Sequence, residues 1–79
     1  MNIRFLNEAE KQFHNLDANT AGRIMKGILG IPGKGDIKPL KGEFSGKYRL
    51  RIGDWRIFFL ISDDTIFIDR IEARGGAYK

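Results

Sequence analysis

The chain has 79 residues, of which 42% are hydrophobic and 30% charged, and its formal net charge is +4. A chain of this length forms one domain, residues 1–79, with room for an open groove but not for a large internal cofactor cavity. The absence of cysteine excludes disulfides and thiolate metal sites. No apolar run approaches the roughly 18 residues of a membrane span, and the N-terminus lacks a signal-peptide core, so we expect a cytoplasmic protein without a membrane partner.

The chain begins with a predicted strand and helix. Residues 2–6 alternate polar and apolar side chains, which is typical of a short strand. Asn7 and Glu10 then have the spacing of a capping box, which predicts that a first amphipathic helix begins there. Its only histidine, His14, has no chemical partner nearby in the sequence and is interpreted as a solvated helix residue.

A second amphipathic helix is predicted from the apolar stripe within residues 21–29, after turn and N-cap side chains at residues 17–19. Gly22 and Gly27 weaken this helix by roughly 1 kcal/mol each relative to alanine. The run that follows, residues 30–42, contains both prolines of the chain and four glycines. We therefore predict that the whole run is a loop.

The remaining sequence switches to a period of two. Three strands are predicted, at residues 48–52, 55–61 and 65–71, separated by the dipeptides Gly53-Asp54 and Asp63-Asp64. A Gly-Asp dipeptide between two alternating runs is typical of a two-residue hairpin turn. The turn sets the register of the first two strands, whereas the register of the last strand stays open.

This register separates an apolar face from a basic face. It places the following residues opposite each other: Ile52 and Trp55, Arg51 and Arg56, Leu50 and Ile57, Arg49 and Phe58. The predicted core face consists of Tyr48, Leu50, Ile52, Trp55, Ile57, Phe59 and Ile61. The opposite face consists of Lys47, Arg49, Arg51 and Arg56, with Phe58 and Leu60 beyond them.

The basic face indicates an anionic ligand. Residues 34–56 contain seven cations and three acids, so this segment carries the whole net charge of +4. Directly opposed arginines destabilise a hairpin unless solvent screens them or an anion lies between them. Because the planar guanidinium binds phosphate oxygens bidentately, we interpret the cluster around Arg51 and Arg56 as a phosphate site. A screened basic face without a ligand fits the same pattern.

Two stretches carry a family resemblance. KPLKGEFSGKYRLRIGDWRIFF, residues 38–59, and EARGGAYK, residues 72–79, resemble the RelE/ParE superfamily of toxins from toxin–antitoxin systems. The resemblance covers essentially the full chain and implies an α+β fold, with an antiparallel sheet and two helices packed on one of its faces. Its RelE branch implies a ribosome-dependent endoribonuclease that cleaves mRNA, and its ParE branch implies a non-enzymatic inhibitor of DNA gyrase.

The resemblance also implies site residues and partners. The catalytic positions would be Arg49, Arg51, Arg56, Arg74 and Tyr78, and the RNA-binding positions would be Lys41, Lys47, Phe58 and Lys79. The implied partners are a cognate antitoxin, in a toxin–antitoxin hetero-oligomer, and the ribosome with its mRNA. No metal and no cofactor is expected. Clustered strand arginines together with a terminal arginine and tyrosine favour the nuclease over the gyrase inhibitor.

The chemistry of such a site leaves the proton acceptor open. Metal-independent RNA cleavage requires a deprotonated 2′-hydroxyl, a stabilised phosphorane and a protonated leaving oxygen. Arginine can stabilise the phosphorane, but with a pKa above about 12 it is a poor base. Proton transfer would therefore fall to Tyr78, or the reaction would rely on positioning by the ribosome. Glu72 is interpreted as an ion-pair partner of Arg74 rather than as a base.

Overall fold

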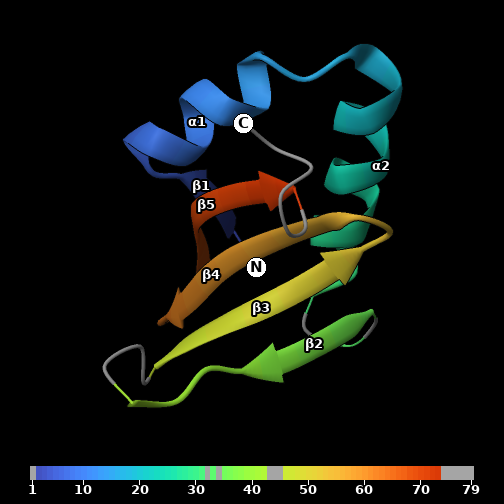
Figure 1. Ribbon diagram of the computed structural model, residues 1–79. Coiled ribbons are helices and arrows are strands. Elements are labelled where there is room, and N and C mark those ends of the chain that lie inside the picture. The colour runs from blue at the N-terminus through green and yellow to red at the C-terminus, as the bar shows by residue number, and fades with distance from the viewer. Residues whose placement is uncertain (1, 32, 34, 43–45, 74–79) are drawn as a thin grey trace.

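The structure is a computed structural model that describes all residues except 1, 32, 34, 43–45 and 74–79. Its elements are β1 (Asn2–Phe5), α1 (Asn7–His14), α2 (Ala18–Leu29), β2 (Asp36–Pro39), β3 (Lys47–Ile52), β4 (Trp55–Ser62) and β5 (Thr65–Ala73). The strands form one sheet in the order β1-β5-β4-β3-β2 (Figure 1). Strand β1 is parallel to β5, and all other neighbours are antiparallel. The predicted α+β fold is confirmed, but the sheet is mixed rather than purely antiparallel, because β1 joins it in parallel.

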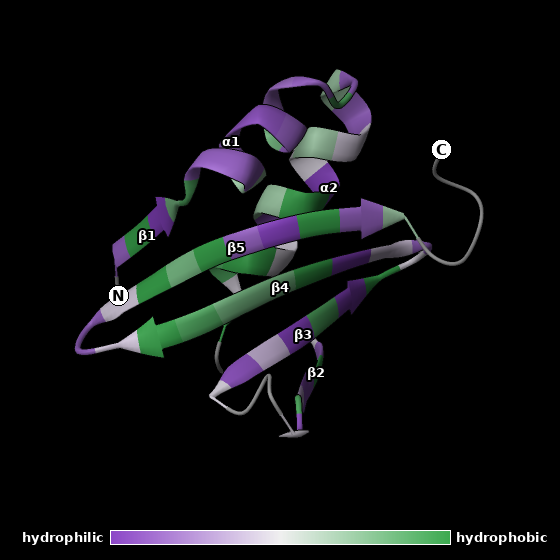
Figure 2. Cartoon of the chain, turned by 60° about the vertical axis from the view of Figure 1, so that its left-hand side comes forward, coloured by the Kyte–Doolittle hydropathy of each residue, from purple (hydrophilic) through white to green (hydrophobic). Residues whose placement is uncertain are grey.

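The core lies between the two helices and the inner face of the sheet. Ala9 of α1 and Ile24 and Ile28 of α2 are fully buried in one cluster with residues of the strands. The strand residues in that cluster are Leu50, Ile57, Phe59, Ile66, Ile68 and Ile71. Figure 2 shows apolar and polar residues alternating along β3, whereas most of β4 is apolar. Burial of each large apolar side chain stabilises the fold by about 1.5–3 kcal/mol. The predicted core face is confirmed, because all of its residues belong to this cluster or pack against it.

The run of residues 30–42 is not a continuous loop, so that prediction was wrong. Asp36–Pro39 form the edge strand β2, antiparallel to β3. Ile37 pairs with Leu50 and packs against the core, which gives this short strand an apolar anchor. Pro39 is tolerated because an edge strand can leave one side of its backbone without hydrogen bonds.

Helix α1 begins at Asn7 as predicted, but the capping box is not formed. Its N-cap is Leu6, with no hydrogen bond from the N-cap side chain. The N–H of Leu6 donates to the carbonyl oxygen of Ile68 at 2.9 Å, and the Leu6 carbonyl accepts from the N–H of Glu10 at 2.8 Å. Pairing with the sheet therefore fixes where α1 begins. Helix α2 has the expected side-chain cap, since Asp17 accepts from the N–H of Thr20 at 3.1 Å.

The hairpin of β3 and β4 has the predicted two-residue turn and register. Gly53 has a φ of 56°, a left-handed conformation that glycine adopts without a steric penalty. Strand β5 departs from a regular ladder because Phe58 pairs with Arg70 whereas Phe59 pairs with Ile68. Asp69 is therefore the extra residue of a β-bulge, which places two successive polar residues between buried isoleucines.

Candidate functional site

The face of the sheet away from the helices carries charged side chains in rows that cross the strands. One row consists of Asp36, Arg51, Arg56 and Glu72, which are successive partners on β2, β3, β4 and β5. The next row consists of Lys38, Arg49, Phe58 and Arg70. The predicted opposition of Arg51 and Arg56 is confirmed. A carboxylate stands on each outer side of that arginine pair.

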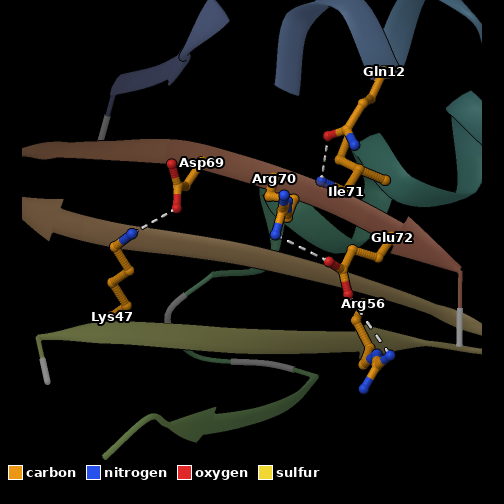
Figure 3. A network of polar contacts seen from close by, with 7 residues as sticks. All are labelled: Gln12, Lys47, Arg56, Asp69, Arg70, Ile71 and Glu72. Carbon is orange, nitrogen blue, oxygen red and sulfur yellow. Dashed lines mark hydrogen bonds and ion pairs between the residues drawn. The ribbon is translucent and has the colours of Figure 1, made fainter. Parts of the chain in front are cut away.

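Carboxylates of the chain itself compensate these arginines. Glu72 Oε2 lies 3.3 Å from Arg70 Nη1, and Glu72 Oε1 lies 3.7 Å from Arg56 Nη2 (Figure 3). Arg49 Nη2 lies 3.6 Å from Asp36 Oδ1. The expectation that only solvent or a bound anion would relieve the like-charge pair was therefore incomplete. The compensating carboxylates lie on β2 and β5, outside the hairpin of β3 and β4.

Lys47 is held by a shorter contact. Its Nζ donates to Asp69 Oδ2 at 2.7 Å, and both side chains are about one-third exposed (Figure 3). The bulge in β5 makes this contact possible because it turns Asp69 out of the regular alternation and toward β3. Lys47 therefore brings little unbalanced charge to the site.

The arginines keep donors for a ligand. Contacts of 3.6–3.7 Å are ion pairs but too long for hydrogen bonds, and each guanidinium has five N–H donors. The Nε atoms of Arg49 and Arg56 are buried and have no acceptor among the described residues. Arg51 is exposed, and within the described part of the chain it forms no ion pair. The ends of these side chains can therefore bind an anion at the surface.

A groove of about 610 Å³ lies on the same face. Among the described residues, Leu40 and Phe58 form its apolar lining. Its described charged lining comes from Glu8 of α1, Lys47 of β3, and Asp69, Arg70 and Glu72 of β5. Phe58 stands in the second row between Arg49 and Arg70, so the groove and the arginines adjoin each other.

The structure brings together five of the predicted site residues on β3 and β4, namely Lys47, Arg49, Arg51, Arg56 and Phe58. Lys41 is exposed after β2 and is not among the residues that line the groove. Arg74, Tyr78 and Lys79 lie outside the described residues. Glu72 is an ion-pair partner, as expected, but of Arg56 and Arg70, whereas its predicted partner Arg74 is not described.

Sequence reasoning missed Glu8, Asp69 and Arg70 on this face. It also missed Asp36 and Lys38, because it placed both in a loop. The spacing of the isoleucines in β5 held a signal for Asp69 and Arg70. Ile66 and Ile68 are two positions apart, whereas Ile68 and Ile71 are three positions apart. A change of this kind within a strand indicates a bulge. Glu8 had no such signal, because its place at the groove depends on how α1 packs beside the sheet.

Two other features bear on the chemistry. His14 is exposed at the end of α1, consistent with a solvated residue. Within the described residues, no group of three or more His, Asp or Glu side chains is arranged to hold a metal ion. In the same part of the chain, neither helix is long and apolar enough to cross a membrane.

Comparison with known proteins gives consistent matches. Residues 3–78 match the family model of the ParE toxin of type II toxin–antitoxin systems. The chain is 26% identical to toxin RelG of Mycobacterium tuberculosis, over 98% of this chain and 94% of that protein. It is similar to the RelBE2 toxin–antitoxin complex of the same organism, with a TM-score of 0.78, 26% identity, and coverage of 92% of this chain and 96% of that chain. It is also similar to the RelB–RelE antitoxin–toxin complex of Methanococcus jannaschii, with a TM-score of 0.74, 26% identity, and coverage of 89% and 88%.

Proposed function

The chain belongs to the ParE toxin family of type II toxin–antitoxin systems, within the RelE/ParE superfamily, and we propose that it is a ribosome-dependent endoribonuclease that cleaves mRNA. The observation that carries the proposal is the open face of the sheet. There Arg51 and Arg56 stand opposite each other, and Arg49 lies in the next row. Paired guanidinium groups on an uncovered surface suit a phosphodiester, because several N–H donors can reach one phosphate.

The arginines would supply charge stabilisation in the cleavage reaction. The 2′-oxygen attacks phosphorus, the bond from phosphorus to the 5′-oxygen breaks, and a 2′,3′-cyclic phosphate and a 5′-hydroxyl form. Arg49, Arg51 and Arg56 would hold the negative charge of the phosphorane, which is usually the largest catalytic contribution. Glu72 is an unsuitable base because both of its oxygens face arginines. Tyr78 and Arg74 are proposed to take part in proton transfer and leaving-group stabilisation.

We also propose that a cognate antitoxin neutralises this toxin in a hetero-oligomer. Two of the similar structures are complexes of a toxin with its antitoxin, and this chain covers most of each toxin. Lys41 and Lys79 are proposed as further backbone contacts for RNA. RNA and an antitoxin that covers the basic face would compete for that face.

The decisive experiment is primer extension on mRNA during induced expression of the toxin. Cuts in phase with codons are expected for the wild type and should be lost in Arg51→Ala, Arg74→Ala and Tyr78→Phe. Lys26→Ala is the matched control, because it removes an exposed cation in the last turn of α2, away from this face. Purified toxin should cut mRNA on programmed ribosomes and leave DNA gyrase active. Gyrase arrest without mRNA cleavage would instead establish the ParE-type activity.

A further inference from the structure

The groove beside the arginines has a different charge from the rest of the open face. Its described lining holds three carboxylates, of Glu8, Asp69 and Glu72, and two cations, Lys47 and Arg70. Each of the two cations already has a carboxylate partner, at 2.7 Å for Lys47 and 3.3 Å for Arg70. A phosphate placed there would meet a net negative charge from the described residues. The groove is therefore unsuited to the RNA backbone, although it lies within a basic surface.

The apolar lining indicates what the groove can accept. Phe58 is half-buried between Arg49 and Arg70 in its row, and Leu40 provides a second apolar side chain. A flat, uncharged group with polar edges could lie against the phenyl ring while the rim contributes hydrogen bonds. Single-stranded RNA carries such groups next to its phosphates, since its bases stack on aromatic side chains.

We propose that this groove is a nucleobase subsite, in which Phe58 stacks on the base while the arginines of β3 and β4 (Arg49, Arg51 and Arg56) hold the neighbouring phosphate. The inference rests on the proposed RNA substrate and adds where the base of that substrate lies. The two regions adjoin because Arg49 and Phe58 are direct partners across β3 and β4.

The rim also predicts which bases fit. Lys47 contacts Asp69 through Oδ2, so Oδ1 remains as an acceptor, and Glu8 is an exposed carboxylate at the α1 side of the groove. Carboxylates accept hydrogen bonds from the amino groups of adenine, cytosine and guanine. Uracil has no amino group, and its single N3–H donor lies between two carbonyl oxygens that a carboxylate repels. The subsite should therefore disfavour uracil.

The test measures binding of short single-stranded RNAs that differ at one base, by fluorescence anisotropy at several salt concentrations. Phe58→Leu keeps an apolar side chain of similar size but removes the aromatic face, and it should weaken binding about tenfold without changing the salt dependence. Phe58→Trp should bind at least as tightly as the wild type. Arg51→Ala should instead reduce the slope of log affinity against log salt by about 0.7, because one phosphate contact is lost. Glu8→Gln should narrow the difference between uracil and the other bases.

Equal affinity of Phe58→Leu and the wild type would overturn the subsite, as would equal binding of all four bases by the wild type. A change in the salt slope of Phe58→Leu would show that it acts on backbone contacts and would also count against the proposal. Thermal unfolding of each variant identifies any loss of folded protein. Base-dependent binding without mRNA cleavage would refute the proposed nuclease while supporting this subsite. Cleavage of mRNA with base-independent binding would support the proposed nuclease and refute this subsite.

Discussion

Gln12 is a single side chain that joins α1 to the sheet. Strand β1 pairs with β5 only as far as Ile68, so the following stretch of β5 has no strand on that edge. The side-chain carbonyl oxygen of Gln12 accepts a hydrogen bond from the N–H of Ile71 at 2.7 Å (Figure 3). Ile71 is 2% exposed, so water is a poor substitute for this acceptor. The Gln12 side chain thus satisfies a backbone N–H that a neighbouring strand would otherwise pair with.

Gln12→Leu should lower the free energy of unfolding by about 1–3 kcal/mol, because a buried N–H loses its partner. Gln12→Glu keeps an acceptor at the same position and should retain most of the stability. Lys11→Met changes the adjacent exposed residue and should stay within about 0.5 kcal/mol of the wild type. Urea unfolding measures all three. A Leu variant as stable as the Lys11 control would show that α1 is held by apolar packing alone.

Asp17 gives the N-terminus of α2 a pH dependence. Hydrogen bonds from the hydroxyl group of Thr20, and then from its N–H, hold the pKa of Asp17 below the ordinary value of 3.8. The stabilisation from a lowered pKa is complete above the unfolded value and is lost as the pH falls through the folded value. Asp17→Asn keeps a capping oxygen but does not titrate. The excess stability of the wild type over Asp17→Asn should therefore shrink at low pH in unfolding experiments, whereas a constant difference would contradict this role.

At the scale of elements, the two glycines inside α2 have different surroundings. A Cβ added at Gly22 would meet nothing within 4 Å. A Cβ added at Gly27 would clash with the Cδ1 atom of Ile52 and would lie 3.1 Å from its Cγ1 atom. The helix approaches β3 closely at Gly27, so this residue has a packing role that Gly22 lacks.

Gly22→Ala should raise the free energy of unfolding by about 0.5–1 kcal/mol, since alanine has the better helix propensity and the site is open. Gly27→Ala gains the same propensity but forces Ile52 to move. It should therefore be less stable than Gly22→Ala by a margin that chemical denaturation can resolve. Equal gains from the two substitutions would show that Ile52 yields without cost and that α2 does not need a glycine at this contact.

The elements that sequence predicted well are those with a local cause. The hairpin of β3 and β4 follows from a Gly-Asp turn between alternating runs, so its register and the meeting of Arg51 with Arg56 could be deduced. Strand β2 could not, because four residues that include Pro39 have no periodic signal and form a strand only beside β3. The start of α1 likewise depends on pairing between Leu6 and Ile68.

The candidate site divides in the same way. Its cations were predicted from the alternation of β3 and β4, whereas the carboxylates that compensate them lie on β2 and β5. Their positions depend on strand order and on the bulge at Asp69, which are properties of the assembled sheet. The sequence therefore predicted a face of cations with apolar neighbours and without the compensating carboxylates. The folded chain has a pair of arginines flanked by acids, beside a groove whose described lining is slightly acidic.

For the whole molecule, the sheet separates an apolar core from a charged face. The stability of that face depends more on the order of acids and arginines across the strands than on net charge. In the row Asp36, Arg51, Arg56, Glu72, the two arginines lie next to each other and an acid lies on each side of them. Opposed like charges are destabilising, and adjacent opposite charges reduce that penalty. The acids at the two ends therefore allow the arginines to stay together without a bound anion.

Glu72→Gln tests this compensation, because it leaves Arg56 and Arg70 without their shared carboxylate. The free energy of unfolding should fall by up to about 1 kcal/mol at low salt, and the loss should shrink near 1 M salt, where the screening length is about 3 Å. Asp64→Asn is the matched control: it also raises the net charge from +4 to +5, but it lies exposed in the turn between β4 and β5. If the two variants lose the same stability at every salt concentration, total charge alone governs this face. A larger, salt-sensitive loss in Glu72→Gln would show that the cross-strand row holds its arginines in place.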